Sequence, residues 1–358
     1  MKKLILIFLF LLLPGVCFGA TYYMATAAGG GNDGNDGSIG SPWLTFNFSE
    51  SQLGANDTLY IRAGTYTETG ETDINVAGVT IQNYQNEIVL LEYTEAQAIA
   101  FLSISADGIT LSGLGIVRNS ATPYHVIQIG AAGTNFTITN CTVYVNSGNP
   151  NTGYDCINNP NDGADYMIIE DSEIYNCDNQ AIDIVNGPSY AIIRRNVIYD
   201  SQNGIVVKWD SEGHIIEKNL VYNTTFQGIL LGGTSAGGTF QAKNTVARNN
   251  IVWYPSTGDD IPGLLIRGCT NCQAYNNIIY RGGIRVDDDA VSGNVSSYVT
   301  LKNNIIVAHG RAVNDDGVIY VDAGSTTGFS ASNNLYYQLS SGTFVMHFDG
   351  GNESFATW

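Results

Sequence analysis

Short apolar runs recur along the chain, and a polar or glycine-containing turn separates each run from the next. The pattern is clearest over residues 192–231, which contain two similar phrases, IIRRNVIYDSQNGIVV and IIEKNLVYNTTFQGILL. Runs of about four or five residues that are rich in β-branched and aromatic side chains are typical of strands and are too short for helices. The pattern therefore predicts a chain built from many short strands.

One position in the phrase defines the length of the repeat. It is an asparagine before an aliphatic and aromatic run, and it recurs at Asn196, Asn219, Asn250, Asn277, Asn304 and Asn334, with Ser172, Cys141 and Leu114 in the same place upstream. Neighbouring positions lie between 23 residues (196 to 219) and 31 residues (141 to 172) apart. A unit of this length that returns many times is the signature of a solenoid, in which each strand pairs in parallel with its copy one coil away. The amide side chains would then stack at one corner and bond to turn backbone groups that are otherwise buried without partners.

The first 20 residues differ from the rest in composition. Two lysines precede an apolar run over residues 4–13, and small residues follow up to Ala20. This is the composition of a secretory signal peptide, and the run is too short to anchor the chain across a bilayer. We therefore expect residues 1–20 to be a signal peptide and the mature protein to be secreted, periplasmic or on the cell surface. Cys17 leaves a lipoprotein signal as the alternative, although Val16 is not the small residue expected before a lipidated cysteine.

Two phrases near the start are informative, TYYMATAAGGGNDGNDGSIGSPWLTF at residues 21–46 and NDTLYIRAGTYTE at Asn56–Glu68. With the repeats, they resemble secreted proteins of the pectate lyase-like superfamily, which include calcium-dependent uronate polysaccharide lyases. The resemblance covers nearly all of the chain after the leader and implies an all-β, right-handed parallel β-helix with three strands per coil. It implies an N-terminal cap with the first strands over residues 21–68 and β-helix repeats over residues 69–358. The final phrase ESFATW usually continues in such proteins, so we expect further coils beyond Trp358.

The composition is that of a chain with a large core and many turns, because 44% of the residues are hydrophobic, 13% are charged and 41 of 358 are glycine. No linker interrupts the repeats, so we expect one array of coils after the cap. The formal net charge of −18 opposes binding to nucleic acid and to anionic membrane surfaces. A polyanionic substrate therefore needs a cation or a local basic cluster at the contact.

Five cysteines follow the leader, and this odd number leaves at least one of them unpaired in an exported protein. Cys141 lies at a ladder position, so we expect it to be a buried free thiol. Cys269 and Cys272 lie in a turn between strands, where a tight disulfide and two free thiols both remain open. The four histidines form no pair with the spacing of metal ligands, which favours structural roles for them.

One strand of each coil follows a turn that often ends in glycine, and its side chains alternate between the two faces of a sheet. The residues expected to point inward are Ile182, Ile205, Ile229, Leu264 and Ile284. The residues expected to point outward are Asp183, Val206, Leu230, Leu265 and Arg285, followed two residues later in their strands by Lys208, Arg267 and Asp287. Asp155 shares the position of Asp183 if Tyr154 and Cys156 face the core, and Cys156 takes that position after a shift of one residue. The face would carry acids at one end and bases further along.

The resemblance also implies roles for this face. In the calcium-dependent lyases, acids hold a calcium ion that binds the substrate carboxylate, and a Lys or Arg on a following coil removes the neighbouring ring proton. By this resemblance Asp155 and Asp183 are calcium ligands, Lys208 is the base, and Arg267 and Arg285 bind further carboxylates of an acidic polysaccharide.

The calcium shell would need more oxygens than two aspartates supply, and Asn158, Asn179 or water could complete it. The chain departs from the family at this point. The lyases carry an acid cluster Asp-Asp-Gly-x-Asp, whereas residues 179–183 read NQAID and keep only Asp183.

Other interpretations of the same residues remain open. Polar outward side chains also keep a solenoid soluble, so the rod could be a non-catalytic surface or adhesion protein. A glycoside hydrolase of the same fold would need carboxylates on both sides of a sugar, and Asp183 with Asp155 or Asp210 is the available set. The lyase hypothesis requires the carboxylates of Asp155 and Asp183 within about 6 Å and the Lys208 amine within about 10 Å of the site between them.

The aromatic residues Tyr144, Tyr175, Tyr199, Tyr222, Trp253 and Tyr280 recur at one outward position. They could offer a platform for sugar rings or stack on one another and so stabilise the parallel strands. We favour stacking.

Overall fold

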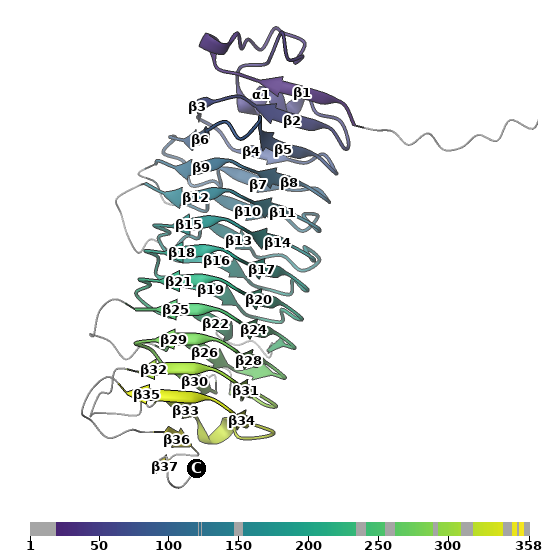
Figure 1. Cartoon of the computed structure of the whole chain (residues 1–358). Coiled ribbons are helices and arrows are strands. Elements are labelled where there is room, and N and C mark those ends of the chain that lie inside the picture. Colours follow the sequence, from purple (N-terminus) through teal and green to yellow (C-terminus); the bar gives the residue numbers. More distant parts are fainter. Residues whose placement is uncertain are drawn as a thin grey trace, which may run out of the picture.

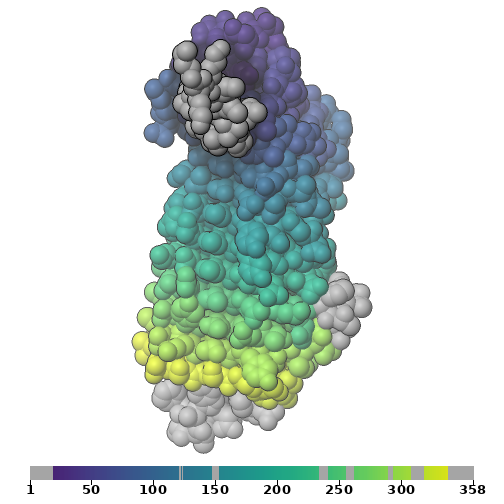
Figure 2. Space-filling view, turned by 90° about the vertical axis from the view of Figure 1, so that its right-hand side faces the viewer, coloured from purple at the N-terminus to yellow at the C-terminus, as the bar shows by residue number. Residues whose placement is uncertain are grey.

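The computed structural model describes residues 19–120, 122, 124–146, 153–233, 241–254, 262–288, 293–308, 318–338, 346–348 and 351–353. The signal peptide expected over residues 1–20 therefore lies almost wholly outside the described residues. The described chain winds into a rod of stacked coils that contribute strands to three long sheets (Figure 1). The coils follow one another in sequence order, so the colours form successive bands from one end of the rod to the other in Figure 2. The prediction of an all-β parallel β-helix with three strands per coil is confirmed.

Sheet I carries the acids and bases singled out in the sequence. Its strands are β4 (Thr72–Ile74), β7 (Leu102–Ile104), β10 (Ile127–Ile129), β13 (Ile157–Asn159), β16 (Gln180–Ile184), β19 (Asn203–Val207), β22 (Ile229–Gly232), β26 (Leu264–Arg267), β30 (Ile284–Asp287), β33 (Ile319–Val321), β36 (Met346–Phe348) and β37 (Gly351–Glu353). All neighbours pair in parallel except β36 and β37, which are antiparallel.

Sheets II and III complete each coil. Sheet II contains β1 (Thr21–Met24), β2 (Thr58–Ile61), β5 (Thr80–Asn83), β8 (Thr110–Ser112), β11 (Thr137–Thr139), β14 (Ile168–Glu170), β17 (Ile192–Arg194), β20 (Ile215–Glu217), β24 (Val246–Arg248), β28 (Gln273–Tyr275), β31 (Thr300–Lys302) and β34 (Ser330–Ser332). Sheet III contains β3 (Gly64–Glu68), β6 (Val89–Tyr93), β9 (Gly115–Arg118), β12 (Thr142–Val145), β15 (Glu173–Tyr175), β18 (Val197–Tyr199), β21 (Leu220–Tyr222), β25 (Ile251–Trp253), β29 (Ile278–Tyr280), β32 (Ile305–Ala308) and β35 (Leu335–Gln338).

The remaining elements are short. They are the pair β23 (Ala242–Lys243) and β27 (Cys269–Thr270), the 3-10 turns η1 (Ala27–Gly29) and η2 (Ala323–Ser325), and the helix α1 (Phe46–Ser51). Helix α1 lies at the N-terminal end of the rod (Figure 1), where Phe46 is fully buried and the backbone N–H of Phe46 donates to Glu68 Oε1 over 2.7 Å. Among the described residues no helix is long and apolar enough to cross a membrane.

Columns of aliphatic side chains fill the interior of the rod. In sheet I the inward column contains the predicted residues, and each is at most 1% exposed: Ile182, Ile205, Ile229, Leu264 and Ile284. Burying one such side chain contributes about 1.5–3 kcal/mol, so a column of them stabilises the stacking of the coils. The inward half of the alternation predicted from the sequence is confirmed.

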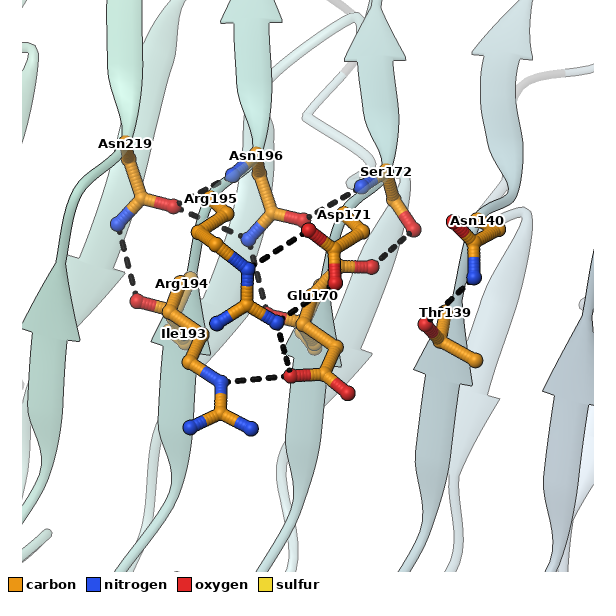
Figure 3. Close-up of polar contacts among 11 residues, drawn as sticks. Thr139, Asn140, Glu170, Asp171, Ser172, Ile193, Arg194, Arg195, Asn196 and Asn219 are labelled. Carbon is orange, nitrogen blue, oxygen red and sulfur yellow. Dashed lines mark hydrogen bonds and ion pairs between the residues drawn. The ribbon is translucent and has the colours of Figure 1, made fainter.

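The repeated asparagines form a ladder between sheets II and III, which we call the asparagine corner and define as Asn196, Asn219, Asn250, Asn277, Asn304 and Asn334. All of them are buried except Asn334, which is partly buried. At Asn219, Nδ2 donates to Ile193 O over 2.9 Å and to Asn250 Oδ1 over 3.0 Å. Its Oδ1 accepts from the backbone N–H and from Nδ2 of Asn196, each over 3.0 Å (Figure 3). The expected stacking of amides at one corner is confirmed, and it satisfies backbone groups that water does not reach.

The residue before each ladder position has a left-handed backbone. The φ values run from 52° at Asp171 to 58° at Lys218 in Asn140, Asp171, Arg195, Lys218, Asn249, Asn276, Asn303 and Asn333. Asparagine and aspartate tolerate this conformation better than longer side chains do. Arg195 is held there by ion pairs with Asp171 at 2.6 Å and Glu170 at 2.8 Å, which Figure 3 shows beside the ladder.

The outward aromatic column lies on sheet III. Ring centroids are 4.8 Å apart between Tyr144 and Tyr175 and 4.9 Å apart along the next two pairs, with interplanar angles of 5° to 8°. From Tyr144 to Tyr222 each ring face is therefore covered by the ring of the next coil, whereas the Trp253 ring is tilted by 36° from Tyr222 at 5.8 Å. Because a sugar stacks on a ring face, this geometry supports the stacking interpretation over the platform.

The states of three cysteines in the structure agree with the predictions made from the sequence. Cys141 is a buried free thiol, as expected, and burial raises its pKa to about 12. Cys269 and Cys272 form a disulfide, which was one of the two possibilities left open. A second disulfide joins Cys156 to Cys177 and was not predicted.

Candidate active site on sheet I

The outward side chains of sheet I form one column along the rod. Successive register partners in this column are Asn158, Asp183, Val206, Leu230, Leu265, Arg285 and Tyr320. Two residues further along the strands, Arg267 and Asp287 are register partners, and Lys208 directly follows β19. The outward set predicted from Asp183 to Arg285 is therefore confirmed. Figure 1 shows β16, β19, β22, β26 and β30 stacked in this order.

A buried ion pair links two neighbouring coils of the column. Lys208 Nζ lies 3.2 Å from Asp183 Oδ2, and only 17% and 7% of the two side chains are exposed. The Trp209 ring also contacts the amine, with 5.0 Å between Nζ and the ring centroid. Burial raises the pKa of Asp183, and the charge of Lys208 opposes this rise. Within the described part of the chain Asp183 Oδ1 is buried and has no hydrogen-bond partner.

Asp155 does not occupy the column position in which the sequence placed it. The register partner of Asp183 is Asn158, and Asp155 lies three residues earlier, before β13 begins. The physical reason is that Ile157 takes the inward place, whereas Cys156 is buried at the turn that leads into the strand. Both registers considered from the sequence are therefore wrong.

Asp155 nevertheless belongs to the same charged group, which we call the proximal centre and define as Asp155, Asp183 and Lys208. Its Oδ1 accepts from the Gln180 backbone N–H over 3.0 Å, and its Oδ2 accepts from Asn158 Nδ2 over 2.8 Å. Burial, followed by the charge of Asp183, raises the pKa of Asp155 to about 8. The charges of Asp183 and Lys208 both act on the pKa of Asp155, the first raising it and the second lowering it, so the three groups lie near one another.

The proximal centre offers some of the oxygens that a calcium ion requires. Asp183 Oδ1 is a buried carboxylate oxygen that accepts no hydrogen bond within the described residues, and burial, followed by the charge of Asp183, raises the pKa of the neighbouring Asp155. Calcium prefers carboxylate and amide oxygens in a shell of six to eight. Asp183, Asp155 and the amide of Asn158 fit this preference, although Asp155 must share oxygens that already accept hydrogen bonds.

The arginines form a second charged group further along the rod, which we call the distal centre and define as Arg267, Arg285 and Asp287. Both arginines lie 2.9 Å from the same oxygen, Asp287 Oδ2, and Asp287 is buried. The Arg285 guanidinium also stacks over the Tyr320 ring, 4.6 Å from the centroid. One carboxylate therefore holds two guanidinium groups, each about one third exposed.

More acids lie beside the distal centre. Ligand atoms of Asp287, Asp288 and Asp322 all lie within 4.8 Å of one another. Burial, followed by the charges of Asp322 and Asp287, raises the pKa of Asp288. Sequence reasoning took Asp287 as an outward residue and did not find this group, because Asp322 comes from the next coil.

Two residues beside the proximal centre were missed. The Asp155 backbone N–H donates to His125 Nδ1 over 3.0 Å, and burial lowers the pKa of His125 to about 4, so the imidazole is neutral at pH 7. Trp209 has a left-handed backbone with φ of 56°. A signal for His125 was available, because YHVIQI at residues 124–129 aligns with YDCINN at residues 154–159 and places His125 opposite Asp155. No comparable signal marks Trp209.

Asp210 pairs with a lysine outside the proximal centre. Its Oδ1 pairs with Lys243 Nζ at 3.6 Å, and both side chains are more than 40% exposed. Asp210 is thus a surface partner of Lys243, and it leaves Asp155 and Asp183 as the two acids of the proximal centre.

Comparison with known proteins agrees with the architecture. The family described as "Right handed beta helix region" matches residues 125–253, which include the proximal centre and end before Arg267. The family description agrees with the predicted right-handed winding of the parallel coils. No curated protein matches the sequence.

Several solved structures share the fold at low sequence identity. A GH136 lacto-N-biosidase from Eubacterium ramulus has a TM-score of 0.64 at 10% identity, over 89% of this chain and 68% of that one. The tailspike protein of Dettilon has a TM-score of 0.59 at 14% identity, over 87% and 66% of the two chains. An alginate lyase from Paenibacillus sp. str. FPU-7 has a TM-score of 0.54 at 16% identity, over 89% and 95%. At these identities the similarity shows the fold alone.

Proposed function

We propose that the protein is an exported polysaccharide lyase that cleaves an acidic, uronate-containing glycan by β-elimination on the outer face of sheet I. The observation that carries the proposal is the buried contact of 3.2 Å between Lys208 Nζ and Asp183 Oδ2, with a free oxygen on the same carboxylate. A basic side chain beside paired acids on one face of a β-helix is the arrangement that the resemblance to uronate lyases implies. The alginate lyase of similar fold is consistent with this class of substrate.

In the proposed reaction Lys208 acts as base only after it has lost its own proton, which the Asp183 carboxylate 3.2 Å away opposes and a bound calcium ion would favour. The neutral amine then takes the proton from the ring carbon next to the substrate carboxylate. The electron pair of that C–H bond forms a carbon–carbon double bond, the bond from the adjacent carbon to the glycosidic oxygen breaks, and the leaving sugar gains a proton. Asp183 orients the Lys208 amine, and Arg267 and Arg285 bind carboxylates of neighbouring sugars. A calcium ion held by Asp183, Asp155 and Asn158 would neutralise the substrate carboxylate and make the ring proton more acidic.

The test is the ultraviolet absorbance of the unsaturated product on pectate, alginate and chondroitin-type polymers, with calcium and with a chelator. The proteins are the wild type, Lys208→Ala and the charge-preserving Lys208→Arg, whose guanidinium holds its proton more strongly than an amine and is therefore the weaker base. We expect absorbance with the wild type that Lys208→Ala abolishes and Lys208→Arg lowers. Absorbance that survives in both variants would remove Lys208 from the mechanism, and absorbance that survives the chelator would remove calcium.

One observation favours glycoside hydrolysis as a second candidate. The raised pKa of Asp155, about 8, leaves this acid protonated at neutral pH, as a general acid must be, and the lacto-N-biosidase shares the fold. Asp155 is only 2% exposed, however, which places its proton out of reach of a sugar in this conformation. New reducing ends without ultraviolet absorbance would identify the hydrolase, and neither signal on any polymer would favour a non-catalytic rod.

A further inference from the structure

The turn that follows β19 differs in composition from the turns of the neighbouring coils. Strands β16, β19 and β22 are in register, and two places beyond their last shared position the chain carries Asn186, Trp209 and Gly233. All three have a left-handed backbone, with φ of 65°, 56° and 98°. Glycine adopts this conformation freely and asparagine tolerates it, whereas a bulky side chain is strained by it. Trp209 therefore stands where the repeat favours a small residue.

Trp209 also carries an unpaired polar group. Its indole Nε1 is buried and has no hydrogen-bond partner within the described residues. A buried donor without an acceptor destabilises the folded state, as the left-handed backbone does. The side chain as a whole is partly exposed, so it is not a core residue whose burial would offset both effects. Residues that keep strain of this kind cluster at ligand sites, so these features indicate a binding role.

The Trp209 ring lies against the proposed base. Lys208 Nζ lies over the ring, 5.0 Å from the centroid, and 3.2 Å from Asp183 Oδ2. Lys208 thus occupies one face of the ring. Among the described residues no aromatic ring stacks on Trp209, whereas the rings from Tyr144 to Tyr222 on sheet III cover one another. The second face of Trp209 is therefore not used for ring stacking within this part of the rod.

The next coil leaves room beside this turn. Gly233 has no side chain, and a Cβ added to it would meet no atom of the described chain within 4 Å. Sugar rings carry apolar C–H groups that pack on aromatic faces. The turn thus combines an aromatic face beside Lys208 with space along the rod, which a glycan that continues from the reacting sugar can use.

We propose that Trp209 binds the glycan directly and that the ring face opposite Lys208 stacks on the sugar residue next to the one that reacts. The proposal rests on the proposed function and adds an aromatic subsite beside the proximal centre. It explains why a tryptophan is kept at a position where its neighbours are asparagine and glycine.

The test measures dissociation constants by calorimetry in the Lys208→Ala variant, which does not cleave the probe and lacks the contact between the amine and the ring. The probes are galacturonate, mannuronate and unsulfated chondroitin hexamers with calcium present. We expect added Trp209→Asn to weaken binding at least about tenfold, which corresponds to about 1.4 kcal/mol. Added Trp209→Phe keeps an aromatic face, so binding should stay within about threefold. Lys208→Gln serves in the same way if Lys208→Ala does not fold.

A second measurement and a matched control separate binding from folding. Trp209→Asn alone removes the strained backbone and the unpaired donor, so its urea midpoint should rise. The control is Tyr298→Asn, because Tyr298 is an exposed aromatic residue with φ of 54° between Asn271 and Gly328 in the equivalent places of neighbouring coils. It lies in a turn that leads into sheet II, so its substitution should leave glycan binding unchanged.

The outcomes distinguish this subsite from the lyase itself. Unchanged binding in the Trp209→Asn variant, an equal loss with Trp209→Phe, or a lower urea midpoint for Trp209→Asn would overturn the subsite and leave the lyase proposal standing. A wild type that neither binds a hexamer nor produces ultraviolet absorbance would overturn the lyase proposal, and the role of Trp209 in glycan binding with it.

Discussion

The asparagine corner and the outer face of sheet I use the same repeat in opposite ways. At the corner six successive coils carry the same residue, and each amide bonds to the next over about 3.0 Å. On the outer face of sheet I the column changes from acid to aliphatic to base within five coils. Repetition therefore marks the residues that hold the coils together, and departures from it mark the residues available for chemistry.

The physical reason is that a ladder works only when every rung can both donate and accept. An amide has both groups, so identical amides satisfy one another and the turn backbone. The two charged centres need no such continuity, because an ion pair such as Asp183 with Lys208 is complete within two coils. The following variants test this separation of roles, in order of decreasing effect.

Substitution of the proposed base should separate activity from stability most strongly. Lys208→Arg keeps the positive charge beside Asp183 but weakens the general base, because a guanidinium holds its proton more strongly than an amine, and a general base contributes typically 10²- to 10⁴-fold. We expect at least about a 100-fold loss of lyase rate with an unchanged urea midpoint. A parallel loss of stability would mean that the contact belongs to the structural repeat.

Substitution within the asparagine corner should lower the stability of the fold rather than act on catalysis directly. Asn219→Leu removes the partners of Asn196 and Asn250 and leaves buried donors without acceptors, so we expect a loss of about 3–5 kcal/mol in the free energy of unfolding. Urea unfolding followed by circular dichroism measures it. Asn219→Ser is the matched variant and should cost less, because a serine fills the same slot at Ser172 and accepts from the Cys141 N–H. Equal costs for the two substitutions would contradict the ladder argument.

Acid should weaken the rod through a buried histidine. Burial lowers the pKa of His214 to about 3, while its Nδ1 accepts from the Ala191 backbone N–H over 3.0 Å. An unfolded histidine has a pKa of about 6.5. Between pH 6.5 and the folded-state pKa of about 3, the unfolded chain therefore binds a proton at this residue and the folded chain does not. The free energy of unfolding consequently falls as the pH falls through this range.

At pH 4.5 this difference should cost about 2–3 kcal/mol relative to pH 7. Urea midpoints at the two pH values measure it, with His214→Asn as the variant that keeps an acceptor but does not titrate. A wild type that loses no more stability than His214→Asn on acidification would refute the assignment.

The smallest expected effect is a gain of stability. Lys218 is an exposed residue with φ of 58° in the position that is asparagine in the next four coils. Lys218→Asn should relieve backbone strain and stabilise the protein by up to about 1 kcal/mol. The comparison is Arg195→Asn, which relieves similar strain but loses the ion pairs with Asp171 and Glu170, and should gain less. Thermal unfolding of the two variants gives the ranking.

Sequence reasoning was most accurate where neighbouring coils are alike. The slot from Leu114 to Asn334, the inward column of sheet I and its outward neighbours were all placed correctly, because alternation of side chains leaves no freedom once one residue is fixed. It was inaccurate at Asp155, where the coil before β16 changes length and a register shift of one or more residues moves every assignment.

The sequence by itself determined the period of the repeat and the stacked asparagines, because both follow from a unit that must stack on its own copy. The odd number of cysteines and the ladder position of Cys141 predicted its free thiol, and the resemblance to β-helix proteins supplied the three strands per coil. Only the tertiary structure decided which charges meet. Lys208 lies against Asp183 from the preceding coil, Arg267 and Arg285 share Asp287, and Asn158 rather than Asp155 stands beside Asp183. Contacts between side chains of neighbouring coils depend on the lengths of the turns between strands. These lengths vary irregularly along the sequence, so the sequence alone did not predict which side chains meet.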